Sequence, residues 1–220
     1  MDPTCHKCNS MAHCAIGRSS ELENCPSNTS ADLFDRVRKI YSDQKDVLLA
    51  TKNASIVEAT GYLKWPRLKD TIEYAKLMGY KKIGIAYCVG LMKEAKKVAE
   101  ILEKYGFEVN SVCCKTGCFK KTDVGVPEEF IMRAKTGYLI GLITCNPVGQ
   151  ALLLNEAKTE MNIICGLCVG HDITFTRFSE APVTTLIAKD RVTIHNPAAV
   201  LYSYYGETFF AEDLRKQKTV

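Results

Sequence analysis

Eleven cysteines in 220 residues are the most unusual feature of this sequence. The polar start, MDPTCHKCNS, lacks the apolar core of a signal peptide, so we expect a cytoplasmic protein. A reducing compartment does not maintain disulfides, and a chain of this length does not need them. The cysteines therefore indicate metal ligands, reactive thiols or both.

The first group of cysteines lies in residues 1–30, which are poor in large apolar side chains. Such a segment cannot fold around its own apolar core, so a metal is its natural organiser. The spacing is C-x2-C-x5-C-x10-C-P, formed by Cys5, Cys8, Cys14 and Cys25. Four thiolates suit tetrahedral Zn²⁺ or an iron–sulfur cluster, and either His6 or His13 could replace one cysteine. We expect a closed, structural metal knuckle; the alternative is a disordered tail with incidental cysteines.

The second group of cysteines lies at the ends of predicted strands. Ligands of an open parallel sheet bind at the carboxyl ends of its strands, and four of five predicted strands end in cysteine. Singly, each cysteine is more simply a small buried side chain. Together they favour a shared crevice that holds an iron–sulfur cluster of the 4Fe-4S type, with zinc as an alternative or additional ion. The candidate ligands are Cys88, Cys113 or Cys114, Cys145, and Cys165 or Cys168.

Residues beside these cysteines could take part in the chemistry. Helix N-termini are expected after Cys88 and Cys145, and their free N–H groups would favour the thiolate form. His171 and Asp172 follow the last cysteine and are candidates for acid–base catalysis or ligation. The alternative for this histidine is an ordinary hydrogen-bonded role. The loop after the second strand would make the crevice electropositive if the loop borders it, through Lys115, Lys120 and Lys121; the alternative is a solvated basic loop.

The elements that must position these residues alternate between strand and helix from residue 81 onward. This alternation predicts a doubly wound α/β domain with a mostly parallel sheet of about five strands. The predicted strands cover 83–88, 109–114, 138–145, 161–168 and 183–188. The predicted helices cover 91–105 and 147–160, and two more begin at Pro127 and Pro197.

Three parts are expected along the chain. Residues 1–30 form the cysteine-rich knuckle, 31–80 a helical segment packed on the core, and 81–220 the α/β domain with its cysteine-lined crevice. Apolar residues at helical spacing predict helices over 29–41 and 68–78, and residues 46–63 have a weaker pattern of the same kind.

Charge and motifs exclude several function classes. The chain has 29 Lys+Arg against 25 Asp+Glu, and this mild, dispersed excess does not indicate nucleic-acid binding. No apolar run reaches the ~18 residues of a membrane span. Motifs of P-loop hydrolases, Rossmann dehydrogenases, serine hydrolases and zincins are absent. We expect a small-molecule substrate or a redox partner protein.

Aromatic residues gather near the end of the chain. They indicate packing or the surface of a homo-oligomer. The group comprises Tyr202, Tyr204, Tyr205, Phe209 and Phe210.

Several segments together resemble a known family. They are the N-terminal cysteine cluster, Ala86-Tyr-Cys-Val-Gly-Leu, the stretch from Pro127 through Thr144-Cys-Asn-Pro-Val-Gly-Gln, and Gly166-Leu-Cys-Val-Gly-His-Asp. The chain resembles an uncharacterised prokaryotic family of about this length, a domain of unknown function described as cysteine-rich metal-binding proteins. The resemblance implies metal binding in a cytoplasmic, anaerobic prokaryotic setting, and it assigns no ligand.

Three functional hypotheses follow. The first is an iron–sulfur oxidoreductase or sulfur-transfer enzyme that acts on a small substrate at the strand-end cysteines. The second is a zinc-stabilised, non-enzymatic module for binding, metal sensing or docking. The third is a thiol-transfer enzyme that uses one activated cysteine and no cluster.

Overall fold

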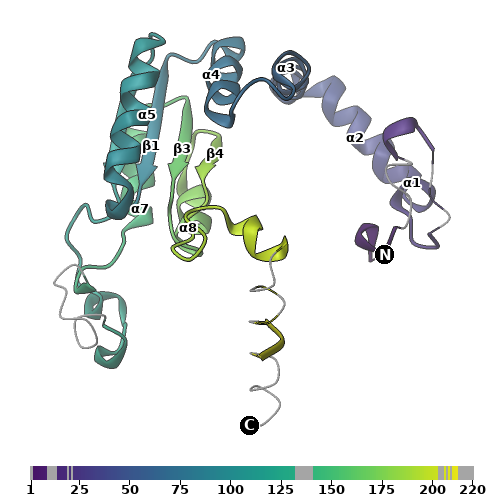
Figure 1. Cartoon of the computed structure of the whole chain (residues 1–220). Helices are drawn as coiled ribbons and strands as arrows, with labels where there is room; N and C mark the ends of the chain where they lie inside the picture. The colour runs from purple at the N-terminus through teal and green to yellow at the C-terminus, as the bar shows by residue number, and fades with distance from the viewer. Residues whose placement is uncertain are drawn as a thin grey trace. The chain divides into compact units, whose positions relative to one another are not determined.

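The computed structural model describes residues 2–8, 14–18, 20, 22–131, 141–202, 206, 208 and 210–212. The chain divides into two compact units, Met1–Thr60 and Gly61–Val220, which are considered separately below (Figure 1).

The first unit is helical. Two short 3-10 turns, Cys5–Lys7 and Cys14–Ile16, precede α1 (Pro26–Thr29), α2 (Ala31–Asp43) and α3 (Lys45–Gly61). Asp32 lies in the first turn of α2, where a carboxylate interacts favourably with the helix dipole. The two longer helices confirm the helical patterns over 29–41 and 46–63.

The second unit contains a four-stranded parallel sheet in the order β2-β1-β3-β4 (Figure 1). The strands are β1 (Lys82–Tyr87), β2 (Glu108–Cys113), β3 (Met161–Cys165) and β4 (Val183–Ile187). The helices around this sheet are α4 (Arg67–Met78), α5 (Met92–Lys104), α7 (Pro147–Glu156) and α8 (His171–Phe178). The predicted α/β class and parallel sheet are therefore confirmed.

Helices cover both faces of the sheet. One core joins α4 and α5 to strand residues such as Ile83, Ile85 and Ile163. A second core joins α7 and α8 to Ala86 and Ile164. Because successive strand residues point to opposite faces, the two cores lie on opposite sides of one sheet, as in a doubly wound fold.

One of the five expected strands, 138–145, is wrong in its described part. Residues 141–145 do not join the sheet, and residues 138–140 lie outside the described chain. Ile143 instead forms an isolated antiparallel bridge with Lys120. An apolar run signals burial without specifying a pairing partner, so the run alone could not distinguish a sheet strand from this local ribbon.

Other boundaries also differ from the expectations. The helix expected at Pro127 is described only as a 3-10 turn, Glu128–Phe130, and residues 132–140 lie outside the described chain. Helix α7 ends at Glu156, and Lys158 just after it has a positive φ of 56°. The segment after Pro197 is a 3-10 helix, Pro197–Tyr202.

The aromatic group near the C-terminus is only partly described. Tyr202 is 89% exposed and Phe210 is 50% exposed. Tyr204, Tyr205 and Phe209 lie outside the described residues. Tyr202 is therefore not packed within the described chain, and the homo-oligomer surface stays a prediction.

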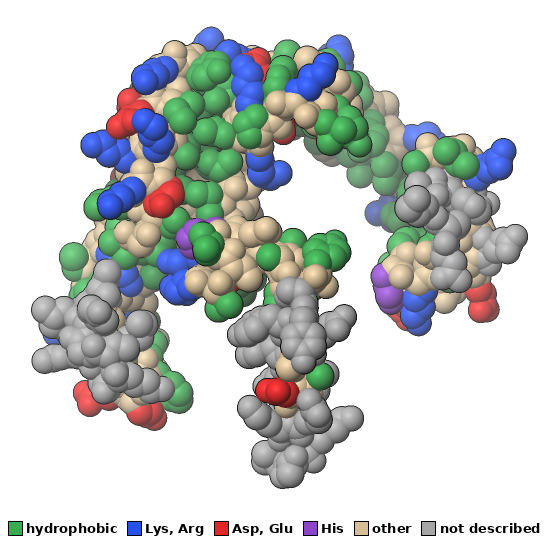
Figure 2. All heavy atoms as spheres, viewed as in Figure 1, with side chains coloured by type: hydrophobic (Ala, Val, Ile, Leu, Met, Phe, Trp, Pro, Cys, Tyr) green, Lys and Arg blue, Asp and Glu red, His purple; other side chains and the backbone are tan. Residues whose placement is uncertain are grey.

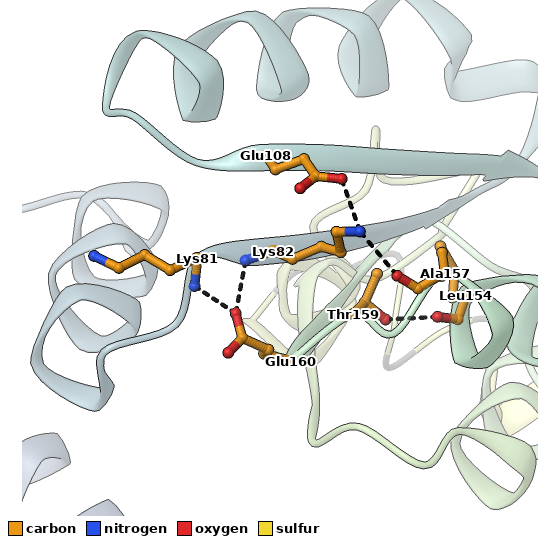
Figure 3. Close-up of polar contacts among 7 residues, drawn as sticks. All are labelled: Lys81, Lys82, Glu108, Leu154, Ala157, Thr159 and Glu160. Carbon is orange, nitrogen blue, oxygen red and sulfur yellow. Dashed lines mark hydrogen bonds and ion pairs between the residues drawn. The ribbon is translucent and has the colours of Figure 1, made fainter.

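The amino ends of the central strands are held by a polar network (Figure 3). The Glu160 carboxylate, just before β3, accepts hydrogen bonds from the backbone N–H groups of Lys81 at 2.5 Å and Lys82 at 2.8 Å. Lys82 Nζ pairs with Glu108 of β2 at 2.8 Å and donates to Ala157 O at 3.1 Å. This network ties β1, β2 and β3 together at the end opposite the strand-end cysteines.

Lys and Arg side chains are distributed over the face shown in Figure 2 instead of forming a single stripe. No helix in the described chain is both long and apolar enough to cross a membrane.

Candidate functional site

Two cysteines follow directly after neighbouring parallel strands. Cys88 comes after β1 and Cys114 after β2, so both lie at the carboxyl edge of the sheet. The N–H of Cys114 donates to Tyr87 O at 2.8 Å, which continues the β1–β2 pairing to this point. Cys88 is 5% exposed and Cys114 is 1% exposed. The N–H of Val89 donates to Cys114 Sγ at 3.4 Å.

Cys145 reaches the same edge from the loop that leads into α7. The N–H of Asn146 donates to Cys114 O at 2.8 Å, and Cys145 Sγ lies 3.6 Å from Cys114 Sγ. Asn146 caps α7 by accepting a hydrogen bond from the N–H of Gly149 at 2.9 Å. Its Nδ2 also donates to Thr116 O at 3.1 Å. The cap therefore holds the Cys145 loop against the loop that follows β2.

His171 links Cys145 to a fourth cysteine. It begins α8, and its N–H donates to Cys168 O at 2.9 Å in the turn after β3. Interactions with the Cys145 and Cys168 side chains raise the pKa of His171 to about 9. Its Nδ1 is buried and has no hydrogen-bond partner within the described ranges. The neighbouring Asp172 caps its own turn, where Oδ1 accepts from the N–H groups of Gly170 at 3.0 Å and Ile173 at 2.8 Å.

Three basic side chains contact the cysteine sulfurs. Lys115 Nζ lies 3.4 Å from Cys145 Sγ and also donates to Ile143 O at 2.7 Å. Lys189 Nζ contacts Cys88 Sγ. Arg191 Nη2 lies 3.4 Å from the sulfur of Cys168. Lys189 and Arg191 were not predicted from the sequence; the available signal was their position directly after β4, at the same sheet edge.

The electrostatics favour two thiolates on either side of one thiol. The Cys114 thiol and then the Lys189 ammonium lower the pKa of Cys88 to about 5. The Cys114 thiol and the His171 imidazole lower the pKa of Cys145 to about 3. The facing sulfurs of Cys145 and Cys88 raise the pKa of Cys114, because a third negative charge between them is unfavourable. Cys114 is therefore the protonated member of this group.

Cys168 has a similar environment. Hydrogen bonding with His171, followed by Arg191, lowers the pKa of the Cys168 thiol. We use the term strand-end cluster for Cys88, Cys114, Cys145, Cys168 and His171.

Two further candidate ligands lie on the other side of the sheet. Cys113 is in register with Tyr87, which packs against the core beneath α4 and α5, so both side chains point to that face. Cys165 belongs to the same core at 0% exposure, and burial raises its pKa to about 11. Alternation along the strands thus separates Cys113 from Cys114, and Cys165 lies away from the cluster.

The N-terminal knuckle is not confirmed. Within the described ranges, no three Cys, His, Asp or Glu side chains gather closely enough to hold a single metal ion. Cys5 and Cys14 are exposed, whereas Cys25 is buried. Cys8 Sγ donates to Ser20 Oγ at 3.3 Å, and Cys14 Sγ lies 3.7 Å from Ser27 Oγ. His13 lies outside the described residues.

Comparisons with known proteins identify a family of unknown function and an uncharacterized relative. A family model described as "Protein of unknown function (DUF1847)" matches residues 25–186, which include all four cysteines of the strand-end cluster. The chain is also 46% identical over 182 residues to the uncharacterized protein MJ0455 of Methanocaldococcus jannaschii, covering 79% of this chain and 86% of that protein. The chain therefore belongs to the DUF1847 family.

Proposed function

We propose that this protein binds an iron–sulfur cluster through Cys88, Cys114, Cys145 and Cys168, and that it has a redox or sulfur-handling activity on a small substrate. The observation that carries the proposal is the meeting of the Cys114 and Cys145 sulfurs at 3.6 Å, with Cys88 beside Cys114 and with His171 between Cys145 and Cys168. Free thiols that are kept together at a sheet edge are suitable ligands for a soft metal centre.

The arrangement of these sulfurs favours a cluster over a single zinc ion. The thiols form a row of neighbours, from Cys88 through Cys114 and Cys145 to Cys168 by way of His171. A single ion needs its ligands to converge on one point, and no such group is found in the described part of the chain. A cluster takes one thiolate at each iron, so it suits a row of ligands, and the Cys114 and Cys145 sulfurs, 3.6 Å apart here, would move apart to bind it.

The surroundings of the sulfurs suit a negatively charged group. Lys115, Lys189 and Arg191 each contact a cysteine sulfur, and so place positive charge beside the proposed ligands. The N–H of Val89 donates to Cys114 Sγ, and the N–H of Gly90 donates to Cys88 Sγ, both at 3.4 Å. Hydrogen bonds to sulfur and nearby charge are the features that tune a cluster's reduction potential. When bound, such a cluster supplies electron transfer or a Lewis-acidic iron.

We propose His171 as the side chain that exchanges a proton with a substrate at this site. It adjoins Cys145 and Cys168, and its buried Nδ1 has no hydrogen-bond partner among the described residues. Asp172 is not proposed as catalytic, because its carboxylate is engaged by the backbone of its own turn.

Single Cys→Ser variants test the proposed ligands. The full chain is produced without oxygen, and bound iron is measured for wild type and for Cys88→Ser, Cys114→Ser, Cys145→Ser and Cys168→Ser. Each of these four variants should bind less iron than wild type, because serine is a harder and weaker ligand for the cluster. Cys118→Ser is the matched control, since Cys118 is exposed and belongs to no proposed site. Circular dichroism confirms that each variant is folded.

Two outcomes would contradict the proposal. Wild-type iron content in all four variants would show that the cluster, if present, is bound elsewhere. Folded wild-type protein that carries zinc and no iron would support the non-enzymatic alternative instead.

A further inference from the structure

Cys114 and Cys145 are close through both their side chains and their backbones. Their sulfurs are 3.6 Å apart, although the residues are 31 positions apart in sequence. The N–H of Asn146 donates to Cys114 O at 2.8 Å, so the two chain segments are already paired at this point. A disulfide needs closely spaced backbones and a sulfur separation of about 2 Å, so only a small side-chain movement would be required.

We propose that Cys114 and Cys145 form a reversible disulfide when the strand-end cluster holds no metal, and that small-molecule disulfides are the oxidant. The inference goes beyond the proposed function, because the geometry of this pair belongs to the chain itself. Only its consequence, the loss of two metal ligands on oxidation, rests on the proposed function.

The order of events follows from exposure. Cys145 is partly exposed, whereas Cys114 is 1% exposed, so a small-molecule disulfide RSSR meets Cys145 first. The Cys145 thiolate attacks one sulfur of RSSR; a Cys145–SR bond forms, the S–S bond of RSSR breaks, and RS⁻ leaves. Lys115 Nζ, 3.4 Å from Cys145 Sγ, stabilises the attacking thiolate.

Cys114 then resolves the mixed disulfide. Its thiol gives up a proton to solvent, and its sulfur attacks Cys145 Sγ, which expels the second RS⁻. In total, the Cys145 thiolate and the Cys114 thiol are oxidised to one disulfide, two electrons reduce RSSR to two thiolates, and the one proton of Cys114 is released. A small-molecule dithiol reverses the reaction by the same route.

Cys88 is a poorer partner for either step. Cys88 is only 5% exposed, whereas Cys145 is partly exposed, so a small-molecule disulfide reaches Cys145 more readily. A Cys88–Cys114 disulfide is therefore not expected, although Cys88 adjoins Cys114.

Non-reducing peptide mapping tests the inference on the metal-free, full-length chain. The protein is incubated with oxidised glutathione, the remaining thiols are alkylated, and the peptides are identified by mass spectrometry. Wild type should yield a Cys114–Cys145 linkage with the loss of two hydrogen atoms, and dithiothreitol should remove it. Cys114→Ser should accumulate glutathione on Cys145, because no resolving thiol remains. Cys118→Ser should behave as wild type does.

Other products would overturn the inference. These are a Cys88–Cys114 linkage, or glutathione that stays on Cys145 in folded wild-type protein. Failure of this inference is distinguishable from failure of the proposed function, because iron binding is measured on separate, anaerobic protein. Protein that binds iron but forms no Cys114–Cys145 disulfide would refute only the disulfide. Protein that forms the disulfide but binds no iron would refute only the proposed iron–sulfur cluster.

Discussion

The side-chain amide of Gln150 donates a hydrogen bond to the carbonyl oxygen of Val112 at 2.7 Å. The same Nε2 donates to Tyr87 O at 3.2 Å, and Gln150 is fully buried. One residue of α7 therefore binds the ends of both β1 and β2, just before Cys88 and Cys114. This contact fixes the helix that follows Cys145 relative to the two strands that deliver the other sulfurs.

We expect Gln150→Leu to lower the free energy of unfolding by about 2–3 kcal/mol, because leucine lacks the N–H donors for these buried contacts. Urea denaturation measures the effect. Gln44→Leu is the control, since Gln44 is exposed, and it should change stability by less than about 0.5 kcal/mol. Equal losses of stability in the two variants would show that the buried hydrogen bonds of Gln150 do not contribute to the free energy of unfolding.

Gly166, which follows Cys165, offers a second test of stability. The chain turns at this glycine and passes close to Leu91. Gly166 has a φ of +75°, and a Cβ at this position would overlap Leu91 Cδ1. Gly106 has a φ of +89° with nothing within 4 Å of such a Cβ. Gly106→Ala should therefore show the cost of backbone strain alone, about 1 kcal/mol, and Gly166→Ala should cost at least about 1 kcal/mol more. Thermal unfolding compares the two, and a smaller loss for Gly166→Ala would contradict the close approach.

Asn146 has two separable roles beside Cys145. Asn146→Ala removes both the helix cap and the bond to Thr116 O, and should cost about 1–2 kcal/mol. Asn146→Asp keeps a cap acceptor at the start of α7 and loses only the donor, so it should cost less. Chemical denaturation of both variants checks this order. If Asn146→Asp and Asn146→Ala lowered the stability equally, the helix cap would not be the main contribution of Asn146 to stability.

We expect Glu160, at the opposite edge of the sheet, to make the stability of the protein depend on pH. Hydrogen bonds from the backbone N–H groups of Lys81 and Lys82 lower the pKa of this carboxyl. Because the pKa of Glu160 is lower in the folded state, its ionised carboxylate stabilises the fold at pH values above the unfolded-state pKa of about 4.3. This contribution to the free energy of unfolding is lost as the pH falls through the folded-state pKa.

The corresponding variant is Glu160→Gln. Since Glu160 is exposed and solvent screens its charge, the variant should be less stable by only about 1 kcal/mol at pH 7. The difference from wild type should shrink below about pH 4. Unfolding curves across this pH range test it, with Glu58→Gln, an exposed glutamate of α3, as the control. A difference that stays constant with pH would rule out the charged hydrogen bonds as its cause.

Four of the five predicted strands are observed, and β1 and β3 were the easiest to predict because each is a short, mostly apolar run. For β1 and β2 the predicted and observed limits differ by one residue. Which of Cys113 and Cys114 faces the strand-end cysteines depends on the face of the sheet to which each residue points, and the strand limits alone do not give that face. The sequence left this choice open, as it did between Cys165 and Cys168.

The other differences have different physical causes. The run from Tyr138 to Cys145 is apolar, but apolarity does not specify the strand with which a segment pairs. Lys189 and Arg191 could not be distinguished from solvated charges, because their contacts with Cys88 and Cys168 depend on the return of β4 to the sheet edge. The N-terminal spacing showed that four cysteines lie near one another in the chain, and it did not show whether they converge.

The content of iron and acid-labile sulfide in full-length protein purified without oxygen tests the central claim most directly. A cluster on Cys88, Cys114, Cys145 and Cys168 predicts brown protein with about four irons and about four sulfides per chain. Folded protein with neither iron nor sulfide, or with zinc alone, would contradict it.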